Sequence, residues 1–261
     1  MAELNIDLHP AQLQIFHSEK RFKIVAAGRR FGKSYLSAWL LLIKAIQSES
    51  KDVFYIAPTF QQAKDIMWAM LKELGRDLIA QAYENTAVLT LINGRKIYLK
   101  GSDRPETLRG VGLSYVVLDE YASMKPVVWE QIIRPTLADV RGGALFIGTP
   151  AGKNHFFDLY KDALEDEDWD AFQFTSNDNP FLPTEEIEAS KKSMSSMSFR
   201  QEFEASFETN SGGIFKEEWF KVDDEPEEGH FVIAIDPAGY EAVEQERNLK
   251  RSRLDETAIA I

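Results

Sequence analysis

The chain of 261 residues contains no cysteine, which excludes a disulfide framework and any thiolate metal site. It also has no apolar run long enough to cross a bilayer, since the longest, residues 38–46, is interrupted by Lys44. The first ten residues are mixed and polar, unlike a signal peptide. These absences are consistent with a reducing, intracellular setting and give no sign of a membrane anchor.

Basic side chains are outnumbered by acidic ones, 30 against 42, and the resulting formal net charge of −12 argues against a general nucleic-acid binder. The imbalance is uneven along the chain. Residues 1–160 hold 20 basic and 16 acidic side chains, whereas residues 161–261 hold 10 and 26. The first part can therefore still contact DNA, although an acidic second part is also typical of a solvated surface.

Apolar segments alternate with helical ones through the first part of the chain. Short apolar runs predict strands over residues 22–27, 53–57, 115–118, 144–147 and 171–175. Helical spacing predicts helices over residues 32–47, 61–74, 154–163, 184–192 and 196–207, with Thr184 as an N-cap. Asn93-Gly94 predicts a hairpin between residues 87–92 and 96–99. This alternation is typical of an α/β fold with a mostly parallel, doubly wound sheet.

The segment V-A-A-G-R-R-F-G-K-S, residues 25–34, stands between the first strand and the first long helix. Its strand–loop–helix context is that of a phosphate-binding P-loop. Lys33 would reach the β- and γ-phosphates, and Ser34 would place its hydroxyl on Mg2+. Ala27 stands where the general pattern has glycine, so a basic turn between a strand and a helix is the alternative. The loop residues expected to bind the nucleotide are Gly28, Arg29, Arg30, Phe31 and Gly32.

A pair of acids follows a buried strand in Y-V-V-L-D-E. The carboxyl ends of parallel strands share one edge of the sheet, where open α/β sheets bind ligands. We assign Asp119 to the Mg2+ shell and Glu120 to orienting the attacking water. Such a pair is also common in a surface turn, and the assignment therefore depends on the P-loop.

Other polar residues complete the expected site. Thr149 also ends a buried strand and can hydrogen-bond water or the γ-phosphate. An arginine is needed for the charge that develops on the γ-phosphate. The candidates are Arg29 and Arg30 in the P-loop and Arg104 and Arg109 in a later loop. Arg109 precedes the flexible Gly110-Val111-Gly112 stretch, and we expect either contact with a neighbouring subunit or a plain surface charge.

The motifs A-A-G-R-R-F-G-K-S, Y-I-A-P-T, L-R-G-V-G, V-V-L-D-E-Y, F-I-G-T-P and N-P-F-L, in this order, resemble the large terminase subunit of tailed bacteriophages. So does R-Q-E-F-E-A-S-F followed by G-G-I-F. The resemblance implies a P-loop NTPase fold of the ASCE type. Its implied function is ATP hydrolysis that drives double-stranded viral DNA into a procapsid.

The resemblance also implies roles for single residues. Gln12 looks like the glutamine that contacts adenine, and Arg29 or Arg30 looks like the P-loop arginine of the family. Thr149 lies in what looks like the coupling motif. Arg109 resembles the arginine that completes a neighbour's site in the packaging ring. The implied cofactors are ATP and Mg2+.

The last part of the chain resembles the start of the family's RNase H-like nuclease. F-V-I-A-I-D-P-A-G looks like its first strand, with Asp236 as the first metal ligand, and D-E-T-A-I-A-I looks like the second, with Asp255 nearby. Two-metal cleavage needs several clustered carboxylates, and the implied metals are Mg2+ or Mn2+. The family's later acidic ligands would lie beyond Ile261. We therefore expect no DNA cleavage by this chain.

These segments predict three domains: a P-loop ATPase domain over residues 1–178, a helical linker or lid subdomain over 179–228, and an incomplete nuclease fragment over 229–261.

The implied partners are double-stranded DNA, the portal protein of the procapsid, the small terminase subunit and further copies in a ring, with a monomer in isolation and no membrane. The implied location is the host cytoplasm. A helicase-type ATPase and a non-hydrolysing, nucleotide-gated assembly module are the alternatives.

Overall fold

The computed structural model describes residues 6–208, 234–236 and 258–260. The chain divides into two compact units, Met1–Ser211 and Gly212–Ile261. Within the second unit, β9 (Ala234–Asp236) pairs with β10 (Ala258–Ala260) in antiparallel fashion, with Asp236 opposite Ala258. Two strands were expected in these segments, and the expectation is confirmed for these residues. Asp255 lies outside the described residues.

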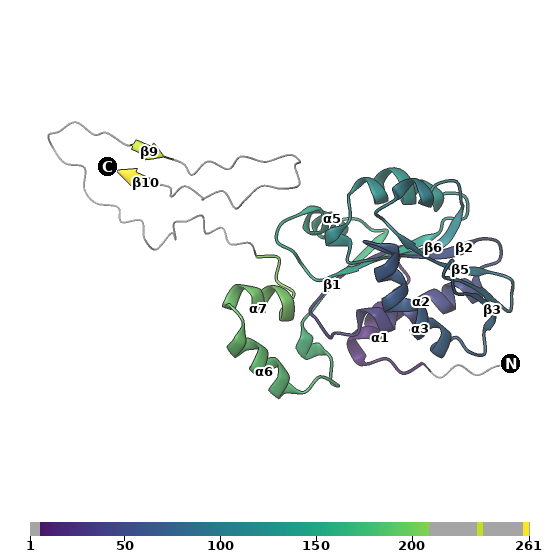
Figure 1. The fold of residues 1–261 in the computed structure, drawn as a ribbon, viewed down its shortest axis with the longest axis horizontal. Coiled ribbons are helices and arrows are strands. Elements are labelled where there is room, and N and C mark those ends of the chain that lie inside the picture. Colours follow the sequence, from purple (N-terminus) through teal and green to yellow (C-terminus); the bar gives the residue numbers. More distant parts are fainter. Residues whose placement is uncertain (1–5, 209–233, 237–257, 261) are drawn as a thin grey trace. The chain divides into compact units, whose positions relative to one another are not determined.

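An eight-stranded sheet in the order β3-β4-β5-β2-β6-β7-β1-β8 forms the centre of the first unit (Figure 1). The six strands from β5 to β8 in this order run parallel, and the predicted α/β fold is confirmed. Their bounds are β5 (Lys96–Gly101), β2 (Asp52–Ala57), β6 (Leu113–Asp119), β7 (Gly143–Gly148), β1 (Phe22–Ala27) and β8 (Trp169–Phe174). The strands β3 (Ile79–Tyr83) and β4 (Val88–Leu91) extend the sheet with antiparallel pairs.

Helices cover both faces of this sheet (Figure 1). One buried cluster joins the sheet to α1 (Pro10–His17), α2 (Lys33–Gln47) and α3 (Phe60–Leu74). The other joins it to the π-helix η3 (Val128–Ile133), which continues into α4 (Arg134–Thr136), and to α5 (His155–Ala163). Strands buried on both faces read as continuous apolar runs, which is why the sequence predicted them well.

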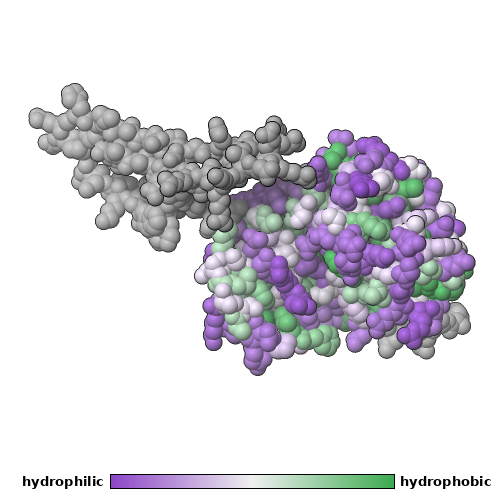
Figure 2. Space-filling view, in the orientation of Figure 1, coloured by the Kyte–Doolittle hydropathy of each residue, from purple (hydrophilic) through white to green (hydrophobic). Residues whose placement is uncertain are grey.

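The remaining elements lie in the connections and after β8. They are three 3-10 turns, η1 (Pro105–Leu108), η2 (Tyr121–Ser123) and η4 (Ser176–Asp178), and the helices α6 (Thr184–Ser193) and α7 (Ser196–Phe203). Among the described residues, none of the helices combines the length and apolar character needed to cross a bilayer. The face of the first unit seen in Figure 2 is mostly hydrophilic, with hydrophobic residues scattered over it.

Two details of the predicted helices were wrong. Thr184 is the first residue of α6 rather than its N-cap, a position that Pro183 occupies without a side-chain hydrogen bond. The predicted helix 196–207 ends at Phe203. Ala205 has a positive φ of 52°, which an α-helix does not permit. This turn directs Phe207 onto α5, where its ring lies 5.7 Å from that of Phe156.

Candidate functional site

A tight loop joins β1 to α2 at the carboxyl edge of the sheet. The Gly28 N–H donates to the Phe174 carbonyl at 3.0 Å, and the Phe31 N–H donates to the Gly28 carbonyl at 3.4 Å. Arg30 and Gly32 have positive φ angles of 61° and 98°. Glycine suits position 32 twice over, because a Cβ there would also lie 2.5 Å from Gln12 Nε2. Helix α2 then begins at Lys33 with its first N–H groups at the loop.

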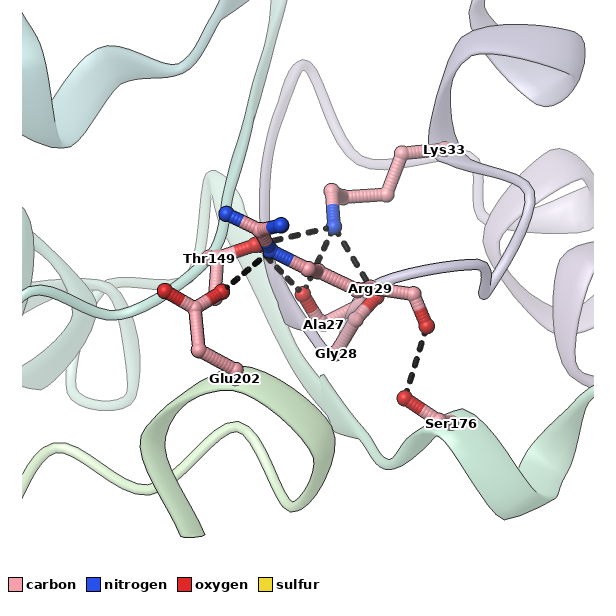
Figure 3. Close-up of polar contacts among 7 residues, drawn as sticks. All are labelled: Ala27, Gly28, Arg29, Lys33, Thr149, Ser176 and Glu202. Atoms are coloured by element: carbon pink, nitrogen blue, oxygen red, sulfur yellow. Dashed lines mark hydrogen bonds and ion pairs between the residues drawn. The ribbon is translucent and has the colours of Figure 1, made fainter. Parts of the chain in front are cut away.

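Lys33 reaches back across this loop (Figure 3). Its ammonium donates to the carbonyls of Ala27 at 2.7 Å and Gly28 at 3.0 Å, and to Thr149 Oγ1 at 3.2 Å. Burial lowers the pKa of Lys33, while the nearby carboxylates of Glu120 and Asp119 oppose that shift. All three acceptors are neutral, so a half-buried cation lacks a directly bound counter-ion. Such a cation is a strong attractor for an anionic ligand.

Asp119 ends β6 beneath the site and is only 3% exposed. One carboxylate oxygen accepts from the hydroxyl of Tyr55, and the other accepts from the Glu120 N–H at 2.9 Å. Burial raises the pKa of Asp119 to about 6, although the Tyr55 hydrogen bond acts in the opposite direction. Glu120 follows with a positive φ of 54°, which turns the chain sharply at the end of the strand.

The segment after β8 holds the loop from its outer side (Figure 3). The Arg29 N–H donates to the Glu202 carbonyl at 2.7 Å, and Arg29 Nε donates to the Glu202 carboxylate at 2.6 Å. Ser176 Oγ donates to the Arg29 carbonyl at 2.6 Å, and Asn179 Nδ2 donates to the Arg30 carbonyl at 2.7 Å. A Cβ at Gly28 would lie 2.5 Å from the Phe203 carbonyl oxygen, so this close approach requires glycine.

A cavity of about 600 Å³ opens above the loop. The predicted residues that line it are Arg29, Arg30, Gly32, Lys33, Ser34, Glu120 and Thr149. Tyr35, Met70 and Glu202 contribute further walls that the sequence analysis did not assign. A phosphate-sized anion in this cavity would face the ammonium, the arginines and the start of α2, which together form an anion site.

A second, smaller cavity of about 270 Å³ adjoins the first, because Gly32 and Tyr35 line both. Its other walls include His9, Gln12, Phe31 and the exposed ring of Phe181. Gln12 Nε2 donates to the Gly32 carbonyl at 2.9 Å, and His9 Nε2 pairs with the Phe31 carbonyl at 2.9 Å. The α1 start is thus fixed to the loop beside an aromatic-lined hollow.

Four predicted residues lie elsewhere. Asp119 does not line the main cavity and is instead buried at the end of β6. Arg109 lines a different cavity together with Lys51 and Asp139, at the amino ends of the strands. Arg104 lines a third, near the carboxyl ends of β2 and β5. Asp236 belongs to β9 in the second unit.

Three residues at the site escaped the sequence analysis: Tyr55, Tyr35 and Glu202. Tyr55 sits in the Y-I-A-P-T motif, and Glu202 in R-Q-E-F-E, so both segments were noted without a role for these side chains. Their partners are 64 and 173 residues away along the chain. Only the strand order and the packing of α7 bring them to the site.

The donor set suits Mg2+, which prefers oxygen ligands and retains waters and substrate phosphates in its shell. Ser34 and Glu120 line the cavity, and the buried Asp119 precedes Glu120 at the end of β6, near enough to Lys33 to affect its pKa. Among the described residues, no group of three or more His, Asp or Glu side chains forms a metal cage. A cation held partly by a bound phosphate ligand fits these residues better than a site built from the protein alone.

Because Asp119 is buried, we expect the substitution Asp119→Asn to raise the free energy of unfolding, by an amount that depends on pH. The folded chain holds a proton on Asp119 up to about pH 6, whereas an ordinary Asp releases it near 3.8. Stability therefore falls as pH rises from about 4 to 6 and stays reduced above, by up to about 3 kcal/mol. Asparagine removes this cost, but its single carbonyl oxygen accepts from only one of the two donors, the Tyr55 hydroxyl and the Glu120 N–H. The lost hydrogen bond destabilises the variant by about 1 kcal/mol, less than the cost that is removed.

Thermal unfolding at pH 7.5 in a chelator should thus give a higher midpoint for Asp119→Asn than for the wild type, with the difference shrinking towards pH 4. The exposed Asp162→Asn is the control and should change little across this range. A wild-type midpoint equal to that of Asp119→Asn at both pH values would contradict the expected linkage.

Comparisons with known proteins bear on this geometry. The family model described as "Terminase large subunit, T4likevirus-type, N-terminal" matches residues 24–222. The terminase large subunit of Escherichia phage T5 is 30% identical over 203 residues, covering 75% of this chain and 46% of that relative. The chain spans about half the length of the curated relatives that it matches.

Solved structures agree. The large terminase ATPase domain of Thermus phage P74-26 aligns with a TM-score of 0.68 and 25% identity, covering 78% of this chain and 95% of that one. The large terminase of another thermophilic bacteriophage, in complex with ATP-gamma-S, shares the fold, with a TM-score of 0.67 at 17% identity over 77% of this chain and 53% of that one. Since the family model covers well over half of the sequence, the chain belongs to the family of T4-like terminase large subunits, in the N-terminal part that this model describes.

Proposed function

We propose that this chain hydrolyses ATP and that the hydrolysis powers translocation of double-stranded viral DNA into a procapsid. The observation that carries the proposal is the Lys33 ammonium, half-buried at the carboxyl edge of a parallel sheet and bonded only to neutral oxygens. A triphosphate supplies the missing negative charge. Family membership supports the same activity, and the ATP-gamma-S complex of the thermophilic phage terminase supports nucleotide as the ligand.

The polar residues that the sequence predicted for this site have defined tasks in this proposal. The loop N–H groups and the start of α2 cradle the phosphates, and Lys33 exchanges its carbonyl partners for β- and γ-phosphate oxygens. Glu120 faces the same cavity and orients the attacking water. Thr149, already bonded to Lys33, senses the γ-phosphate. Bound Mg2+, held through Ser34 and Asp119, would neutralise phosphate charge.

The smaller cavity suits the base. Its volume of about 270 Å³ and its walls of Phe31, Tyr35 and Phe181 fit a flat heterocycle. Gln12 presents its amide there while bonded to the Gly32 carbonyl, so a bound base and the phosphate loop share one anchor. This assignment places adenine beside α1 and the triphosphate over α2.

Arg109 fits a role in a neighbouring subunit. It lies at the amino ends of the strands, whereas the P-loop lies at the carboxyl ends, so it cannot serve its own chain's site. A ring of copies on the portal of the procapsid would bring the arginine of one chain to the cavity of the next. The partners that follow are DNA, the portal protein and the small terminase subunit, in the host cytoplasm.

The nuclease residues stay a prediction. Asp236 closes β9, which pairs with β10 as the first two strands of an RNase H-like sheet would. The proposed metals there are Mg2+ or Mn2+.

Glu120→Gln tests the hydrolytic role. Glutamine keeps the size of the side chain but cannot accept a proton, so we expect turnover to fall by about 10²–10⁴-fold while ATP binding persists. Phosphate release and calorimetric binding of an ATP analogue measure the two effects. Glu130→Gln, an exposed acid on η3, is the matched control. Equal turnover in Glu120→Gln and the control would refute the assignment, and a wild type without turnover would favour a nucleotide-gated assembly module.

Glu202→Gln tests whether the ion pair with Arg29 opposes nucleotide binding. Glu202 places a carboxylate in the wall of a cavity that would hold a triphosphate, and it occupies an arginine that could contact the phosphates. Neutralising it should tighten ATP binding by about three- to tenfold, with a smaller gain at high salt. Glu204→Gln, exposed near the same helix end, should bind as the wild type does. Unchanged or weaker binding in Glu202→Gln would contradict the idea.

Mixing two inactive variants tests the neighbour role of Arg109. Arg109→Ala alone should lose the rise of specific activity with concentration, because an arginine acting on a neighbour adds about 10³-fold or more. A mixture of Arg109→Ala with Glu120→Gln contains interfaces that pair an intact Arg109 with an intact Glu120, so part of the activity should return. A mixture as inactive as its components would refute the proposal. A strand-displacement assay on the wild type separates a duplex translocase from a helicase.

A further inference from the structure

A hollow of about 350 Å³ lies at the edge of the sheet opposite the P-loop. It is lined by residues near the first positions of three parallel strands: Lys23 of β1, Tyr115 of β6 and Gly143 of β7. The same strands end at the nucleotide cavity, roughly 15 Å away at 3.3 Å per residue. The hollow is therefore separate from the site described above.

Lys23 is the unusual member of this lining. It is only 3% exposed, and among residues 6–208 its ammonium has neither a side-chain hydrogen bond nor an ion pair. Burial, assisted by the nearby Lys44, lowers the pKa of Lys23 to about 8, and Asp170 opposes the shift. Asp170 also accepts a hydrogen bond from Ser18. A buried lysine without a direct partner carries a desolvation cost that an anion would offset.

Tyr115 forms part of the wall of the hollow. Its hydroxyl is fully buried and has no hydrogen-bond partner within the described part of the chain. The Lys44 ammonium lies 5.8 Å from the centre of the same ring. A Cβ at Gly143 would lie 3.2 Å from this ring, so the absence of a side chain at position 143 keeps the hollow open. The Tyr115 ring and the bare Gly143 backbone therefore form the wall of the hollow next to Lys44.

The charges around the hollow are mostly positive. Lys20 donates to the Glu167 carbonyl and Arg21 to the Gly142 carbonyl, so these two cations are already engaged. Lys23, Lys44 and Arg141 have no such hydrogen bonds in the described residues, while Glu19 is the only acid in the lining. Two lysines and an arginine around one small hollow form a donor set for a compact oxyanion.

We propose that this hollow is a phosphate-binding site, in which Lys23 and Lys44 donate to the oxygens of a phosphate group, the Tyr115 ring forms one wall and Arg141 adds charge at the rim. The phosphate is either free, as inorganic phosphate or pyrophosphate, or a phosphodiester of DNA. This inference is independent of the proposed nucleotide site, because the two cavities share no lining residue.

Pyrophosphate binding to the Lys33→Ala chain tests the proposal, since that background weakens the P-loop contribution. Calorimetry should detect binding, and Lys44→Gln should weaken it by roughly tenfold. The control is Lys192→Gln, an exposed lysine on α6, which should leave the affinity unchanged. A short DNA duplex as competitor identifies the source, because it displaces pyrophosphate only if the site also accepts a phosphodiester.

Lys23→Met provides the decisive comparison, because methionine fills a buried position without the charge and should fold at least as stably. In the Lys33→Ala background, pyrophosphate should raise the unfolding midpoint, and adding Lys23→Met should abolish that rise. Near pH 8, binding should also take up protons in the lysine form but not in the methionine form. The facing groups are Lys44 of α2, Asp170 of β8, Tyr115 of β6, and Arg21 and Arg141. An equal response to pyrophosphate with lysine or methionine, or no binding of pyrophosphate or duplex, would overturn the proposal.

Discussion

The contact on which the site depends is the reach of Lys33 back over its own loop. The ammonium touches the last residue of β1, the first glycine of the loop and the threonine that follows β7. It thereby joins two neighbouring parallel strands at the edge where they end. The other features of the cavity are arranged around this half-buried charge, with Glu120 and Arg29 in the same cavity wall and Asp119 buried at the end of β6.

Much of this arrangement followed from local sequence. The run V-A-A-G-R-R-F-G-K-S predicted β1, the loop and α2 almost to the residue, because a buried strand, a glycine-rich turn and a helix start each depend on neighbours in the chain. Asp119 and Thr149 were placed correctly at strand ends for the same reason. The family was also predicted correctly from the order of its motifs.

What the sequence did not predict depends on distant contacts. The edge strand β3 is largely exposed, so it lacks the apolar pattern that marked the other strands. The early end of α7 reflects the packing of Phe207 on α5 rather than any breaker residue. The burial of Asp119 under Tyr55 required the order of β2 and β6 in the sheet, and the approach of Glu202 to Arg29 required a helix 173 residues later.

The grip of the segment after β8 on the loop has a mechanical meaning. Backbone groups of Gly28, Arg29 and Arg30 are bonded to Phe174, Glu202, Ser176 and Asn179. These hydrogen bonds tolerate only small displacements. A shift of the loop backbone must therefore either break them or move α7 with the loop. Movement of the loop is therefore coupled to movement of α7. The two backbones lie closest at Gly28, where a side chain would collide with the Phe203 carbonyl oxygen.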